Sequence, residues 1–143
     1  MLRLAHGLAL GLALVAAGCS TGPRHMRVWG TVTYQGEKVT QGRIEFVPAD
    51  GTDGPTTGGV ITDGSYDVPR EVGPRAGGVY RVELRASRNT GKTEPDPKNP
   101  GARIPVYAPL FPPQYNTGSV LKVTVADDAD KNRFDFHLPE KAR

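Results

Sequence analysis

Short runs in which apolar and polar residues alternate recur along this chain of 143 residues. In the first clear run, Val28, Val32 and Tyr34 fall on one face while Trp29 falls on the other. Alternation with a period of two, rich in β-branched residues, is typical of strands with one buried face. It predicts seven strands, at residues 27–34, 41–47, 59–62, 65–68, 79–86, 120–125 and 132–138.

The apolar positions of these runs form the expected core. The inward residues are Val28, Val32, Tyr34, Ile44, Phe46, Tyr66, Val68, Tyr80, Val82, Leu84, Ala86, Leu121, Val123, Val125, Phe134, Phe136 and Leu138. Between the runs lie turn signals, among them Asp63-Gly64, and the chain holds 18 Gly and 13 Pro in all. Residues 127–131 are expected to join the last two strands as a hairpin. The pattern predicts an all-β domain over residues 27–143, a seven-stranded antiparallel β-sandwich.

Residues 87–119 break this pattern. They carry seven prolines, at positions 95, 97, 100, 105, 109, 112 and 113. The sequence predicts one long Pro-rich loop without strands here. Such a loop in a compact domain is usually either functional or disordered.

The first 18 residues have the organisation of a secretory signal peptide. Arg3 is followed by eleven uncharged, mostly apolar residues at 7–17 and by the only cysteine, Cys19. The run LVAAGC at 14–19 resembles the lipobox of bacterial lipoproteins, with Ala16 where leucine is usual. The resemblance implies cleavage before Cys19, a diacylglyceryl group on its thiol and an acylated amine, which together anchor stably to a membrane. The alternative is an ordinary signal peptide with an incidental cysteine.

This interpretation divides the chain into a signal peptide at 1–18, a lipidated tether at 19–26 and the β domain. It implies a bacterial cell-envelope protein that faces the periplasm. Ser20, after the cysteine, favours the outer membrane over the inner one.

Several strand motifs also carry a resemblance. The segments VWGTV at 28–32, TDGSYDV at 62–68 and GVYRV at 78–82 resemble motifs of carboxypeptidase-regulatory-like and transthyretin-like domains. With FVPADG at 46–51 and PQYNT at 113–117, the pattern is similar to small lipoproteins of planctomycetes. The resemblance implies a transthyretin-like fold and a role in stability, adhesion or ligand binding.

The sequence contains no recognisable catalytic or cofactor motif. It lacks Gly-x-Ser-x-Gly, a phosphate-binding loop and a dinucleotide fingerprint. His25 and His137 lie far apart without a cysteine beside them, which does not make a transition-metal site. The aspartates at 127, 128 and 130, and those at 50 and 53, are better explained by turn chemistry than by a weak calcium site. We therefore expect a non-enzymatic protein without cofactor or metal, with an unrecognised hydrolase site as the remote alternative.

The charge balance argues against a nucleic-acid partner. The formal net charge is +3, and no cluster of Lys and Arg of the kind that follows phosphates is present. The partners expected from sequence are the membrane, through Cys19, and an envelope protein or a glycan.

Four aromatic residues are candidate ligand contacts: Trp29, Tyr107, Phe111 and Tyr115. Aromatic rings with polar neighbours can stack on sugars or anchor a protein. The competing hypothesis is that Trp29 packs under the long loop and pins residues 104–106. The sequence thus predicts a structural or protein-interaction module, with a glycan-binding or small-ligand-binding module at residues 29 and 102–115 as the alternative.

Overall fold

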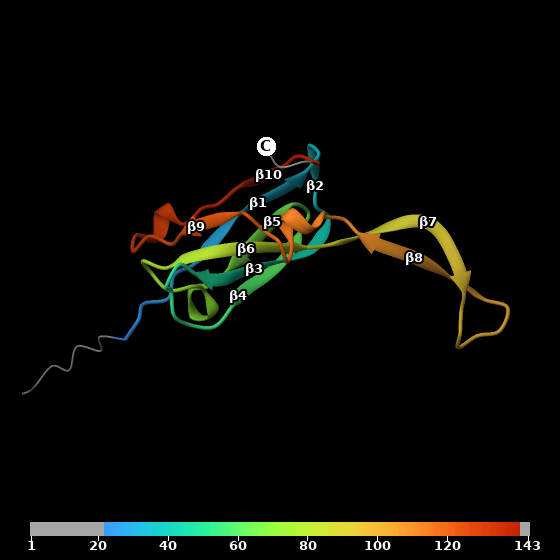
Figure 1. The fold of residues 1–143 in the computed structure, drawn as a ribbon, viewed down its shortest axis with the longest axis horizontal. Helices are drawn as coiled ribbons and strands as arrows, with labels where there is room; N and C mark the ends of the chain where they lie inside the picture. The colour runs from blue at the N-terminus through green and yellow to red at the C-terminus, as the bar shows by residue number, and fades with distance from the viewer. Residues whose placement is uncertain (1–21, 141–143) are drawn as a thin grey trace, which may run out of the picture.

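The structure is a computed structural model, and it describes residues 22–140. These residues form ten strands and three short 3-10 helices (Figure 1). The strands are β1 (Val28–Tyr34), β2 (Glu37–Lys38), β3 (Gln41–Ala49), β4 (Thr57–Thr62), β5 (Ser65–Val68), β6 (Val79–Arg85), β7 (Ser87–Pro95), β8 (Arg103–Pro109), β9 (Lys122–Thr124) and β10 (Phe136–Leu138). The 3-10 helices are η1 (Arg70–Val72), η2 (Pro113–Tyr115) and η3 (Ala129–Lys131).

Eight strands form one curled sheet in the order β10-β1-β5-β4-β3-β6-β9, with β2 paired to β1. Neighbours are antiparallel except for β1 and β10, which run parallel. The expected hairpin turn at Asp63-Gly64 is confirmed, with φ of 49° and 77°. Two successive positive φ angles suit a tight two-residue turn, and the turn joins β4 to β5.

The inner face of the curled sheet holds the core, and the expected inward positions are confirmed there. Val28, Val32, Ile44, Phe46 and Leu84 are completely buried. A few of the expected residues are only partly buried and pack against the core, namely Tyr34, Ala86, Leu121, Val123 and Phe134. Alternation therefore identified the buried face of each strand for which it named inward positions, which excludes the short strand expected at 59–62.

The expected strand-free loop at 87–119 was wrong. Strands β7 and β8 form a two-stranded hairpin that pairs with no other strand and projects from the body of the protein (Figure 1). The sequence hid β7 because Ser87–Pro95 contains no apolar residue whose spacing could indicate a strand. Pairing is irregular between Asn89 and Thr93, where the register shifts.

The expected hairpin between the last two strands was also wrong. Strand β9 pairs with β6, whereas β10 pairs with β1 at the other end of the strand order. Alternation specifies which face of a strand is buried, and it does not specify the strand beside it. The residues between β9 and β10 contain η3 and return alongside β1 through a bridge between Trp29 and Arg133.

The end of the expected tether lies against the β domain. Met26 is buried, and its N–H donates to Pro74 O at 2.8 Å. Ala76 N–H donates to Arg24 O at 2.8 Å, and His25 bridges to Arg75. The chain is therefore fastened to the fold from Arg24 onward, before the first strand begins.

Candidate functional site

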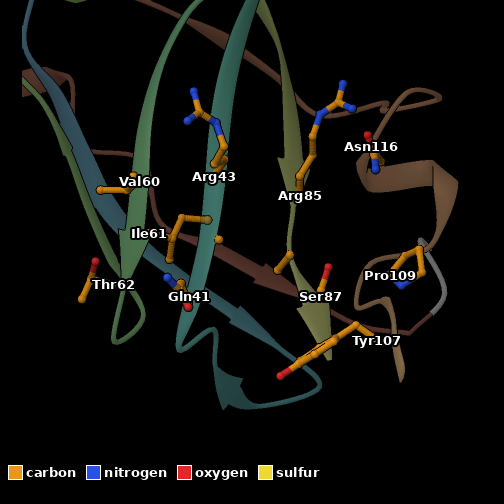
Figure 2. A pocket seen from close by; sticks show the side chains of 12 residues that line it. Gln41, Arg43, Val60, Ile61, Thr62, Arg85, Ser87, Tyr107, Pro109 and Asn116 are labelled. Atoms are coloured by element: carbon orange, nitrogen blue, oxygen red, sulfur yellow. The ribbon is translucent and has the colours of Figure 1, made fainter. Parts of the chain in front are cut away.

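The outer face of the curled sheet carries a cleft at the base of the projecting hairpin. Its volume is about 790 Å³, within the range of small-molecule sites. Strands β3, β4 and β6 form its floor, and residues at the start of β7, the end of β8 and after η2 complete the wall. The lining residues are Gln41, Gly42, Arg43, Val60, Ile61, Thr62, Arg85, Ala86, Ser87, Tyr107, Pro109 and Asn116 (Figure 2).

Two arginines lie at one end of this cleft. Arg43 on β3 stands directly opposite Arg85 on β6 in the strand register. Figure 2 shows the two side chains extending in the same direction from neighbouring strands. Like charges directly opposite one another across strands destabilise a sheet unless other groups balance them.

Arg85 is balanced by two glutamates one step along the sheet. Its guanidinium lies 2.9 Å from Glu83 Oε2 and 3.3 Å from Glu45 Oε2. Glu83 is only 5% exposed and also accepts a hydrogen bond from Arg81 at 2.6 Å. Arg43, by contrast, makes no ion pair or side-chain hydrogen bond with any residue in the range 22–140. The cleft therefore has one uncompensated positive charge.

Tyr107 lies at the opposite end of the cleft in Figure 2. It belongs to β8, and 61% of its surface is exposed. The lining also includes Asn116, which lies on the side of Arg85 in Figure 2 and whose Oδ1 is buried without a hydrogen-bond partner among the described residues. An aromatic ring at one end and a free guanidinium at the other give the cleft an apolar contact and a charged contact.

A second cleft of about 540 Å³ adjoins the first and shares Val60 and Thr62 with it. Trp29 lines it, and the Arg27 guanidinium carbon lies 4.9 Å from the centroid of the indole ring. Arg27 is held there by Asp67, through Nε to Oδ1 at 2.8 Å and a second bond to Oδ2. These hydrogen bonds lower the pKa of Asp67 below its ordinary value, against a smaller opposing effect of burial.

The four aromatic candidates do not form one site. Phe111 and Tyr115 are 4% and 2% exposed and belong to the core. Phe111 packs edge-on against Tyr34 with ring centroids 5.5 Å apart, and the Tyr115 hydroxyl donates to Pro139 O at 2.9 Å. Trp29 and Tyr107 line the two adjoining clefts.

The competing hypothesis for Trp29 placed it beneath residues 104–106. Those residues belong to β8 on the projecting hairpin, whereas Trp29 lies in β1 under Arg27. The expected lipidation site, Cys19, lies outside the described residues.

Three of the five aspartates considered for calcium pair with cationic side chains of the chain. Asp127 pairs with Arg24 at 3.1 Å, and Asp128 pairs with Lys131 at 3.4 Å. Asp50 pairs with a lysine at 2.9 Å. Within residues 22–140, no group of three or more His, Cys, Asp or Glu side chains is arranged to hold a metal ion.

The described part of the chain also contains no helix with the length and apolar character needed to cross a bilayer.

Comparisons with family models, with curated proteins and with solved structures find no match to this chain.

Sequence reasoning missed Arg43 and Arg85 as candidate site residues. Each is one of several charged residues at outward positions of a strand, in the segments RIEF at 43–46 and RVELR at 81–85. What distinguishes them is that they face each other, and this depends on the register between β3 and β6.

Proposed function

We propose that this protein is a non-enzymatic lipoprotein of the bacterial cell envelope, anchored through Cys19 and serving as a structural or protein-interaction module. The observation that carries the proposal is the position of the only cysteine, directly after an apolar segment and two small residues. Two or more acyl chains at that position would hold the protein stably on a membrane, whereas one would not.

The shape of the β domain supports an outward-facing interaction module. The described chain enters the domain at Arg24, and the β7–β8 hairpin projects from the opposite end (Figure 1). A protein anchored just before residue 22 would thus carry the hairpin away from the bilayer. Nearly all residues of β7 are exposed, which leaves that strand free to contact a partner.

We also propose that the curled sheet is a transthyretin-like sandwich. The supporting features are the tight β4–β5 hairpin formed by TDGSYDV and the buried Tyr80 and Val82 of GVYRV. These residues shape the fold and carry no chemistry, so the proposed fold alone does not specify a ligand.

The anchor is tested by replacing Cys19 with alanine in the full-length chain expressed in a Gram-negative host. We expect wild type to incorporate a labelled fatty acid and to sediment with membranes, and Cys19→Ala to lose both properties. Ser20→Ala is the matched control, because it alters the neighbouring residue and leaves the thiol intact. Unchanged membrane sedimentation of Cys19→Ala would contradict the proposed anchor.

A second candidate function is binding of a glycan or small ligand. It is favoured by the two adjoining clefts on the outer face, of which the first exposes Tyr107 at one end and the second is lined by the half-buried Trp29 beyond the shared residues Val60 and Thr62. Phe111 and Tyr115 have no part in it because they are buried.

A further inference from the structure

We infer that the cleft at the base of the β7–β8 hairpin binds a carboxylated oligosaccharide, with Arg43 and Arg85 facing the carboxylate and Tyr107 facing a sugar ring. The inference deepens the second candidate function and rests on it. It concerns the outer face of the sheet and is independent of the lipid anchor.

The charge of the cleft points to an anion. Side chains directly opposite one another in an antiparallel pair have Cβ atoms about 5 Å apart, so Arg43 and Arg85 repel each other. The glutamates that balance Arg85 leave Arg43 without a partner among the described residues. A carboxylate bound beside Arg43 would accept charge-assisted hydrogen bonds and remove this repulsion.

The same surroundings limit the ligand to a small negative charge. Glu45 and Glu83 lie one outward position along the sheet from the two arginines. A chain of closely spaced phosphates or sulfates would bring further negative charges toward these carboxylates. The single free guanidinium, that of Arg43, therefore suits a ligand that places one carboxylate in the cleft.

The rest of the floor suits hydroxyl groups. Gln41, Thr62 and Ser87 line the cleft with uncharged polar side chains that bond to no other described residue. Such groups can both donate and accept, as the hydroxyls of a sugar require. Val60, which is 63% exposed, adds a small apolar contact between them.

Tyr107 supplies the contact for a ring. Its side chain is exposed at the end of the cleft away from the arginines, and the antiparallel partner Asn89 fixes its position in the hairpin. A tyrosine presents an apolar body and a polar tip, which suits the mixed surface of a sugar ring. Because charge and ring contacts lie at opposite ends, the ligand is an oligosaccharide and not a single sugar.

The adjoining cleft gives the chain a place to continue. Val60 and Thr62 belong to both clefts, so a ligand can pass from β6 and β3 across β4 toward Trp29. The face of Trp29 is already covered by Arg27, which Asp67 holds in place. The first cleft is therefore the principal site, and the second is an extension of it.

The test uses the full chain purified in detergent and titrated calorimetrically. The probes are a malto-oligosaccharide in which one residue is a glucuronate, the neutral malto-oligosaccharide of equal length and an acidic peptide. We expect the glucuronate-bearing oligosaccharide to bind, and to bind more weakly as salt rises, because ions screen an exposed charge pair. Arg43→Gln should weaken this binding by about tenfold or more, the effect of losing one charge-assisted hydrogen bond.

Matched variants separate the site from general effects of charge and folding. Arg88→Gln removes the same charge from an exposed position on β7 outside the cleft, and should leave affinity within about twofold. Tyr107→Ala should weaken binding several-fold, whereas Tyr107→Phe keeps the ring and should bind nearly as wild type.

Each outcome has a distinct meaning. Binding of the glucuronate-bearing oligosaccharide that depends on Arg43 and Tyr107 but not on Arg88 supports the inference. Equal binding of the neutral saccharide would overturn the carboxylate specificity while leaving glycan binding in place. Binding of the acidic peptide alone would overturn the saccharide assignment, and binding of none of the probes would overturn the inference and count against the second candidate function as well.

Discussion

Asn132 offers the sharpest test of how the last part of the chain is held in place. The residue is completely buried, which is unusual for a polar side chain, and it lies between η3 and β10. Ala126 N–H donates to Asn132 Oδ1 at 2.8 Å. Asn132 Nδ2 donates to Ala126 O at 2.9 Å and to Asp128 O at 3.2 Å. One side chain thus closes the turn between β9 and β10.

Replacing Asn132 with alanine removes all three hydrogen bonds and leaves backbone groups of Ala126 without a partner. A net contribution of roughly 0.5–1.5 kcal/mol for each bond gives a loss of about 2–4 kcal/mol in the free energy of unfolding. For a domain of this size, the melting temperature should fall by roughly 8–16 °C. Calorimetry or chemical denaturation would measure both quantities.

The aspartate variant of the same position adds a pH dependence. In Asn132→Asp the new carboxylate is buried and faces the carbonyl oxygens of Ala126 and Asp128, so its pKa should be raised above that in the unfolded chain. The protonated acid can still donate one hydrogen bond. Relative to wild type, this variant should therefore lose stability as the pH rises from about 4, the unfolded pKa of an aspartate, through the raised folded pKa.

Two comparisons make the reasoning refutable. Asn132→Ala should show no such added pH dependence, and Asn89→Ala is a control because Asn89 is exposed and makes a single side-chain bond, to Gly91 N–H. The account fails if Asn132→Ala costs no more than Asn89→Ala. It also fails if the stability difference between Asn132→Asp and wild type is constant from pH 4 to 7.

Three further changes test other contacts. Arg27→Gln should uncover the only tryptophan, Trp29, and increase the quenching of its fluorescence by acrylamide. The Arg27–Asp67 pair stabilises the fold above the unfolded pKa of Asp67, and this stabilisation is lost as the pH falls through the lowered pKa of Asp67 in the folded protein. The variant should therefore also show a weaker loss of stability in acid. Leu84→Ala should cost about 2–5 kcal/mol in unfolding free energy, since it empties a fully buried position; a shift below 1 kcal/mol would contradict the packing. Tyr66→Phe should cost about 1 kcal/mol through loss of a 2.8 Å bond to a backbone carbonyl, measured by denaturation.

The core could be predicted from sequence because alternation reports burial directly. Ile44, Phe46, Tyr80, Val82 and Leu84 were expected inside, and all are buried. Each belongs to a strand with one face toward the core and one toward solvent, the case in which a period of two is clearest.

The β7–β8 hairpin could not be predicted in this way because neither of its faces is part of the core. Its first strand is polar throughout, and its second places exposed Pro105, Tyr107 and Pro109 among half-buried residues. Prolines are tolerated at the edges of a sheet, and every strand of a two-stranded hairpin is an edge. Composition alone therefore favoured a loop.

The candidate site depends on proximity that alternation does not encode. Tyr107 and Tyr115 are aromatic residues of the same segment, yet one is exposed and the other is buried. The Arg43–Arg85 pair exists because β3 and β6, far apart in sequence, share one register. Residues that strand pairing brings together, such as Arg43 and Arg85, can be recognised only once the strand order is known.

The position of β1 has a mechanical consequence. This strand follows directly from Arg24–Met26 and lies between β5 and β10, with hydrogen bonds to both. Those bonds run across the strand, so tension that enters from the N-terminal side and acts along β1 loads them in shear, and many must break together. Strands β7 and β8 pair only with each other and with no strand of the curled sheet. Tension applied at the tip of this hairpin would therefore not be distributed over the hydrogen bonds of the curled sheet. The domain is thus built to resist a pull at the end where the proposed anchor begins.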